Sequence, residues 1–108
     1  MKITNIARDF SMTPAGRYYA DGPDSGERFR DEFLEPPLLL GETIVIEIDG
    51  TGGFSSSFLE EAFGGIVRKL RLDRYAAFDR IRISGNETSY KQEIAQYLRQ
   101  AAHDICNE

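Results

Sequence analysis

Apolar side chains recur along the chain with two different periods, which alternate. Residues 43–49 have the strongest strand pattern, because β-branched side chains fill most positions and the glycine-rich segment 50–53 ends the run. Over residues 55–71 the period becomes that of a helix, with apolar residues one and three positions apart. Residues 80–84 again alternate between polar and apolar side chains, as a strand does. These segments predict one β-α-β unit, for which a right-handed connection is expected.

The first third of the chain is predicted to contain a hairpin and a short helix. Residues 2–10 and 17–20 have extended patterns, and the turn-forming segment Thr13–Gly16 separates them. Asp24 can cap a helix start, with a carboxylate three residues later. This helix is expected to end near Glu35, because two prolines follow.

A closing helix is predicted after the second strand of the β-α-β unit. Thr88 or Ser89 begins it, and its apolar stripe runs from Tyr90 to Ile105. The elements together predict an α/β fold in which about three helices pack on a small mixed sheet of about four strands. Residues 1–108 are predicted to form a single domain, because the connections are too short for a second one.

Composition limits the compartment and the partners. The chain carries 13 basic and 18 acidic residues, and its net charge of −5 makes nucleic acid an unexpected partner. The single cysteine, Cys106, excludes an internal disulfide and favours a reducing, cytoplasmic location. No apolar run has the length of a membrane span, and no secretory signal is expected. With His103 the only histidine, no metal site and no cofactor are expected.

The charge is also unevenly distributed along the chain. Residues 21–35 contain six acidic and two basic side chains, whereas residues 68–82 contain six basic and two acidic side chains. Part of the basic segment has a simple explanation, because Arg68, Lys69 and Arg71 lie at the end of the predicted helix, where the helix dipole favours cations. The sequence therefore predicts a dipolar domain.

The most informative stretch joins the central strand to the following helix. It places the Asp49 carboxylate at the end of the strand, then a loop with Gly52 and Gly53, then the three hydroxyls of Ser55–Ser57. Ligands bind at this edge of open α/β sheets, and a helix N-terminus favours anions. Helix capping, regulatory phosphorylation and anion binding are therefore all open roles for the serines. The P-loop, dinucleotide-binding and nucleophile-elbow motifs are absent from the sequence.

Two other features call for an explanation. Gly64 and Gly65 lie inside a predicted helix, where each costs about 1 kcal/mol relative to alanine, so the sheet or a partner is expected to approach the backbone there. The segment 17–30 is dense in turn residues and paired charges, which favours either a binding loop or a turn and helix cap with solvated ion pairs. Its candidate binding residues are Arg17, Asp21, Ser25, Glu27 and Arg30.

The sequence resembles the STAS-like domain family of unknown function, a bacterial group related to the sulfate-transporter and anti-sigma-factor-antagonist (STAS) fold. The resemblance extends from about residue 16 to residue 85. The motifs that carry it are Asp21-Gly22, Ser25-Gly26-Glu27, Phe29-Arg30, Leu34-Glu35-Pro36, Ile46-Glu47-Ile48-Asp49 and the run from Phe54 to Gly65. In anti-sigma factor antagonists, a partner kinase phosphorylates a serine at the start of the helix after the central strand. The resemblance places that role on Ser56.

The resemblance implies a non-enzymatic regulatory domain that binds a protein partner, and a histidine-kinase-like ATPase is the first partner to test. A small-ligand or nucleotide sensor that uses the Gly50–Gly53 loop is the alternative. A hydrolase that uses Asp49 and a serine is the third hypothesis, but no general base of suitable pKa is evident beside the serine.

Overall fold

Three parallel strands form the sheet of this fold. A computed structural model describes the whole chain, residues 1–108. In their order across the sheet, they are β1 (Lys2–Asn5), β2 (Ile44–Glu47) and β3 (Ile81–Ser84). The register aligns Ile46 of β2 with Thr4 of β1 and with Ile83 of β3. Alternate side chains of a strand share a face, and Thr4 and Ile46 are buried on the face that forms the core.

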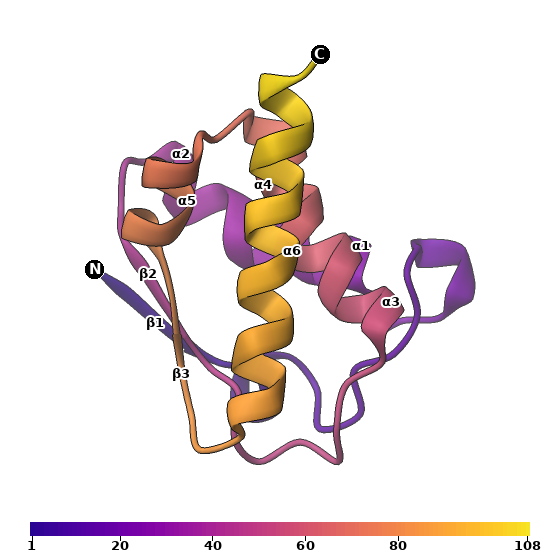
Figure 1. Cartoon of the computed structure of the whole chain (residues 1–108). Coiled ribbons are helices and arrows are strands. Elements are labelled where there is room, and N and C mark those ends of the chain that lie inside the picture. Colours follow the sequence, from indigo (N-terminus) through magenta and orange to yellow (C-terminus); the bar gives the residue numbers. More distant parts are fainter.

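The helices form the second layer, and Figure 1 shows them gathered beside the three strands. They are α1 (Gly26–Phe29), α2 (Glu35–Leu39), α3 (Ser56–Leu59), α4 (Gly65–Leu70), α5 (Arg74–Arg80) and α6 (Thr88–Cys106). Ile3 and Arg82, which belong to the opposite face of the sheet, are exposed. The fold therefore has two layers, with one face of the sheet left open.

Two pairs of short helices are continuous through wider, π-helical turns. Arg30–Leu34 joins α1 to α2, and Glu60–Gly64 joins α3 to α4. The prediction that the first helix ends near Glu35 is wrong. The two prolines directly follow Glu35, whose amide closes the π-helical turn on the carbonyl of Arg30, so they fall where the hydrogen-bond pattern changes, and the helix continues past them.

The expected N-terminal hairpin is absent, so the sheet has three strands rather than about four and is parallel rather than mixed. After β1, the Asn5 side chain caps a single helical turn over Ile6–Phe10. Residues 17–20 form no strand, because the Asp21 carboxylate accepts hydrogen bonds from two backbone amides of this segment and stabilises a 3₁₀ turn over Tyr19–Asp21. Local side-chain hydrogen bonds therefore replace the expected strand pairing.

The central β-α-β unit and the closing helix are confirmed as β2, α3 to α4, β3 and α6. The sequence did not predict α5. Arg71 ends α4 with a left-handed backbone conformation (φ 52°). Asp73 then caps α5 by accepting a hydrogen bond from the amide of Ala76 at 2.8 Å.

A close crossing of α1 and α3 organises the core. Phe29, Phe58 and Phe63 are fully buried, and the ring centroids of Phe29 and Phe58 lie 5.8 Å apart. Gly26 permits the crossing, because a Cβ atom at this position would lie 2.5 Å from the carbonyl oxygen of Phe58. This crossing brings together Arg30 and Glu61, which lie in the π-helical turns that follow α1 and α3.

Candidate functional site

A network of ion pairs lies where the continuous helix of α1 and α2 (the first helix) crosses the continuous helix of α3 and α4 (the second helix). Nη1 of Arg30 donates to Oε2 of Glu61 at 2.5 Å, and the two side chains are only 13% and 10% exposed. Nη1 of Arg17 donates to Glu60 at 2.5 Å and to Glu61 at 3.2 Å. Charge-assisted hydrogen bonds of this kind are roughly twice as strong as neutral ones. They join the segment before α1 and the π-helical turn after it to the π-helical turn after α3.

Two cations of α4 extend the network. Arg68 donates to Glu60 at 2.6 Å, and Lys69 donates to Asp31 at 3.2 Å and to Glu35 at 3.0 Å. The acidic segment 21–35 and the start of the basic segment 68–82 therefore lie against each other. Part of the dipole predicted from the sequence is neutralised inside the fold.

Gly64 and Gly65 leave room for these charged side chains. A Cβ atom at Gly65 would lie 3.1 Å from Nη1 of Arg30 and 3.2 Å from Oε2 of Glu61. A Cβ atom at Gly64 would lie 2.5 Å from Oε2 of Glu60. The close approach predicted from the two glycines is thus made by ion-paired side chains of the chain itself rather than by the sheet.

The network keeps two of its carboxylates ionised. Burial raises the pKa of Glu60, but the hydrogen bonds from Arg68 and Arg17 together lower it by more than burial raises it. The pKa of Glu60 therefore lies below its usual value. Burial also raises the pKa of Asp31, but the hydrogen bonds from Arg30 and Lys69 together lower it by more, so that this pKa too lies below its usual value. Both carboxylates therefore bind protons less readily in the folded chain than in the unfolded chain.

We expect the stability of the fold to fall in mild acid for this reason. Asp31 and Glu60 stabilise the fold above their ordinary pKa values of 3.8 and 4.5, and this contribution is lost as the pH falls through their lower folded-state values. Urea unfolding should show a free energy that declines from about pH 5 downward. The decline should be shallower for Glu60→Gln and unchanged for Glu32→Gln, which removes a half-exposed carboxylate. Equal declines in the two variants would contradict this assignment.

The three serines at the start of α3 have different surroundings, although all three are exposed. Oγ of Ser55 accepts a hydrogen bond from the amide of Phe58 at 3.1 Å, so Ser55 is the helix cap. Ser56 is the first residue of α3 and lies beside Tyr97 of α6. Ser57 makes no side-chain hydrogen bond, so only Ser55 of the three has a clear structural task.

Tyr97 links this helix start to a carboxylate. Its hydroxyl donates to Oε2 of Glu93 at 2.6 Å. Burial and this hydrogen bond raise the pKa of Tyr97 against a smaller opposing effect of the Ser56 side chain. The phenol therefore stays protonated next to Ser56, with its single proton donated to Glu93. Neither Tyr97 nor Glu93 was among the residues predicted for the site.

The glycine-rich loop uses its backbone amides within the fold. The amide of Gly52 donates to the carbonyl of Met12 at 3.0 Å, and the amide of Gly53 donates to the hydroxyl of Thr51 at 3.2 Å. Both carboxylate oxygens of Asp49 accept from the amide of the residue after Gly85, at 3.0 and 3.2 Å. The predicted ligand-binding groups at this edge are thus occupied by neighbouring parts of the chain.

The candidates of the segment 17–30 divide into two groups. Arg17 and Arg30 reach the second helix through the ion-pair network. Asp21, Ser25 and Glu27 shape the segment itself, because Asp21 and Glu27 accept hydrogen bonds from backbone amides and the buried Ser25 caps α1. The alternative of a turn and a helix cap describes the second group. The ion pairs of Arg17 and Arg30 do not fit that alternative, because they are largely shielded from solvent and the alternative expected solvated ion pairs.

The network also joins two motifs of the family resemblance, Phe29-Arg30 and the run from Phe54 to Gly65. The model of the STAS-like domain of unknown function (DUF4325) matches residues 25–91, which include α1, β2, α3 and β3. The chain belongs to this family. Its STAS-like fold is the two-layer arrangement described above, and the match indicates no enzymatic family. Curated proteins and solved structures give no significant match to the chain.

Two further observations concern ligands and membranes. No group of three or more histidine, cysteine, aspartate or glutamate side chains converges in a way that could hold a metal ion. No helix combines the length and the apolar character needed to cross a bilayer.

Proposed function

We propose that this STAS-like domain is a cytoplasmic regulatory module that binds a protein partner at the start of α3, and that phosphorylation of Ser56 switches this binding. The observation that carries the proposal is the division of tasks among the serines. Ser55 caps the helix, which leaves the exposed hydroxyl of Ser56 at the first helical position. The family resemblance supports the same residue.

The surroundings of Ser56 suit a charge switch. A phosphate there would add about −2 charge at a helix N-terminus, whose dipole stabilises anions. It would also compete with Glu93 for the Tyr97 hydroxyl and repel that carboxylate, because Tyr97 lies between them. Phosphorylation would therefore change the charge and the hydrogen bonding of the surface shared by α3 and α6.

The neighbouring segment extends this docking surface. Arg17 is anchored to Glu60 and Glu61 of the second helix, and the two tyrosines that follow it, Tyr18 and Tyr19, are 51% and 49% exposed. Tyrosine is enriched at protein interfaces because it offers a large apolar area with a polar end. A histidine-kinase-like ATPase is the partner that the family resemblance favours, since one protein could both bind to this docking surface and phosphorylate Ser56.

The geometry gives less support to the small-ligand sensor. A phosphate-binding loop needs several backbone amides that point at the ligand, and the amides of Gly52 and Gly53 already have acceptors in the chain. Binding of a ligand there would have to break these hydrogen bonds, whereas binding of a partner at the serines would not.

The switch is tested by incubating the chain with ATP and a candidate histidine-kinase-like ATPase, followed by intact-mass measurement. We expect one phosphate adduct on the wild type and on Ser57→Ala, and none on Ser56→Ala. Calorimetry should show that Ser56→Glu changes the affinity for the ATPase at least about fivefold, whereas Ser57→Glu changes it less. Absence of the adduct together with equal affinities of all variants would contradict the switch.

A further inference from the structure

Two arginines on the surface of α5 and α6 have no partner within the chain. Every other arginine donates to a carboxylate or to a backbone carbonyl. Arg74 and Arg99 do neither, although the chain has 18 acidic side chains for 13 basic ones. An excess of carboxylates makes unpaired arginines unexpected, and these two lie on the same surface.

Helix stability does not explain either arginine. Arg74 is the first residue of α5, where the helix dipole disfavours a cation. Arg99 lies within α6, and the residues three and four positions away from it are alanine, glutamine and histidine, so no carboxylate is within reach along the helix. Both side chains are therefore free to bind an external anion.

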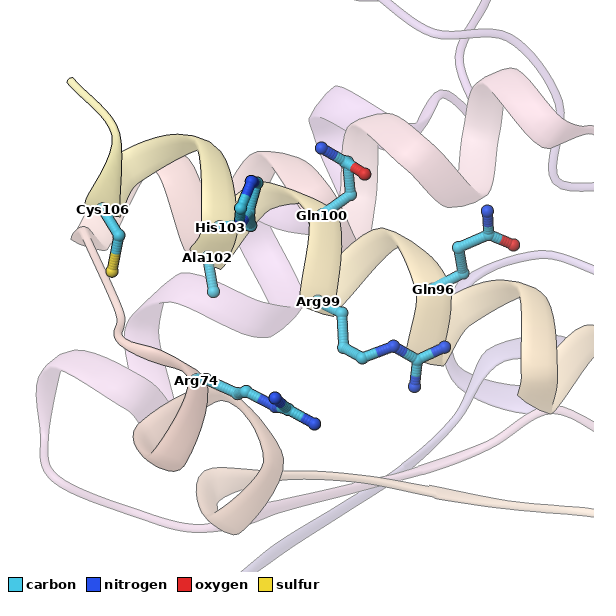
Figure 2. Close-up of a pocket in the computed structure, with 7 residues that line it drawn as sticks. All are labelled: Arg74, Gln96, Arg99, Gln100, Ala102, His103 and Cys106. Carbon is cyan, nitrogen blue, oxygen red and sulfur yellow. The ribbon is translucent and has the colours of Figure 1, made fainter.

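The two arginines extend into one pocket between α5 and α6. Figure 2 shows Arg74 reaching from α5 and Arg99 from α6 into the same space. The pocket has a volume of about 350 Å³, and Gln96 and Gln100 of α6 add polar groups to its wall. A planar guanidinium group can donate two parallel hydrogen bonds to one carboxylate. Two such groups in one pocket form a site for paired or clustered carboxylates.

An aromatic surface adjoins this pocket. Tyr75 and Phe78 line a second pocket, of about 640 Å³, together with the same two arginines and Asp79, whose carboxylate pairs with Arg82. Tyr75 is 89% exposed and Phe78 is 37% exposed. Exposed aromatic side chains beside arginines are typical of the residues that dominate protein–protein interfaces.

We infer that this α5–α6 surface docks an acidic segment of a protein partner. Carboxylates of the segment pair with Arg74 and Arg99, and an apolar side chain beside them packs on Tyr75 and Phe78. Both pockets are open to solvent, so they would leave a small ligand largely exposed, whereas small-ligand sites enclose most of the ligand. A protein segment can cover the arginines and the aromatic rings together. The inference goes beyond the proposed function, because this surface involves neither Ser56 nor its phosphorylation.

The test uses a fluorescein-labelled peptide with a run of glutamates between leucines, and a matched peptide with glutamines in place of the glutamates. Fluorescence anisotropy should show saturable binding of the glutamate peptide that weakens as salt is added. The double variant Arg74→Gln/Arg99→Gln should bind at least about tenfold more weakly. The control Arg8→Gln/Arg71→Gln removes two arginines, 66% and 60% exposed, that have carboxylate partners away from the two pockets, and should bind as the wild type does.

Amide chemical shifts locate the peptide. We expect changes confined to α5 and α6, and the same affinity for Ser56→Ala, so that failure of this inference and failure of the proposed switch can be told apart. Equal binding of the glutamine peptide, or equal loss in the control variant, would overturn the inference. Tighter binding of ATP or inorganic phosphate than of the peptide at Arg74 and Arg99 would overturn it in favour of a small-anion site.

Discussion

Replacement of Arg30 by methionine is expected to lower the free energy of unfolding by about 3 kcal/mol. The substitution keeps a flexible side chain of similar length but removes the guanidinium that pairs with Glu61, a carboxylate whose side chain is only 10% exposed. The unfolded chain hydrates that carboxylate freely, whereas the folded chain would hold it next to Gly65 with only Arg17 as a partner. The cost is thus the desolvation of a charge that has lost its main counter-ion.

Urea unfolding followed by circular dichroism measures this cost. Arg82→Met is the matched control, because it makes the same chemical change at an ion pair whose side chains are 60% and 73% exposed. We expect the control to cost less than about 1 kcal/mol. The double variant Arg30→Met/Glu61→Met should recover part of the loss, because it removes the unpaired charge. Similar losses in Arg30→Met and Arg82→Met would show that the network contributes no more than a surface ion pair.

The second large effect is expected at Gly26, where alanine should destabilise the fold by about 3 kcal/mol. The sign opposes helix propensity, which favours alanine over glycine by about 1 kcal/mol. The new Cβ atom would lie 2.5 Å from the carbonyl oxygen of Phe58 and 3.2 Å from the backbone nitrogen of Ala62. Backbone atoms cannot move aside alone, so α1 and α3 would have to separate, and the contact between Phe29 and Phe58 would loosen.

Gly64→Ala is the matched control for this prediction. Its Cβ atom would also meet an atom at 2.5 Å, but that atom is Oε2 of Glu60, at the end of a flexible side chain. Thermal unfolding should place Gly64→Ala within about 1 kcal/mol of the wild type, since a small shift of the carboxylate offsets part of the gain in helix propensity. If Gly26→Ala were as stable as Gly64→Ala, the close crossing of α1 and α3 would be contradicted.

The parts of the fold that the sequence predicted are those that depend on local periodicity. The β2 strand, the helix of α3 and α4, and α6 each have a long run of apolar residues with one clear period. Besides the helix end misplaced at the two prolines, the errors fall where a single polar side chain decides the local structure. Asp21 turns a segment that looks extended into a 3₁₀ turn, and Asp73 starts a short helix in a stretch without a strong apolar stripe.

The candidate site was predicted less completely, because its groups are distant in sequence. Arg30 and Glu61 are 31 residues apart, and no periodicity shows which carboxylate an arginine will meet. One signal was present, since Gly64 and Gly65 within a helix required a close approach to the backbone. The identity of the approaching groups follows only from the crossing of the two helices. The pairing of Tyr97 with Glu93 is local, since the two residues are four positions apart in α6, but its position beside Ser56 depends on how α6 packs on α3.

The central claim is that the charges of α1 to α4 hold the two helices together and leave the serine-bearing start of α3 free for a partner. Amide hydrogen exchange of the chain, alone and with a histidine-kinase-like ATPase that binds it, tests the claim most directly, because it maps the covered surface at the level of segments. We predict slower exchange on binding in residues 54–58 and 17–22, and no change in β1. Protection that is confined to β1 and the open face of the sheet, with unchanged exchange at the start of α3, would contradict the claim.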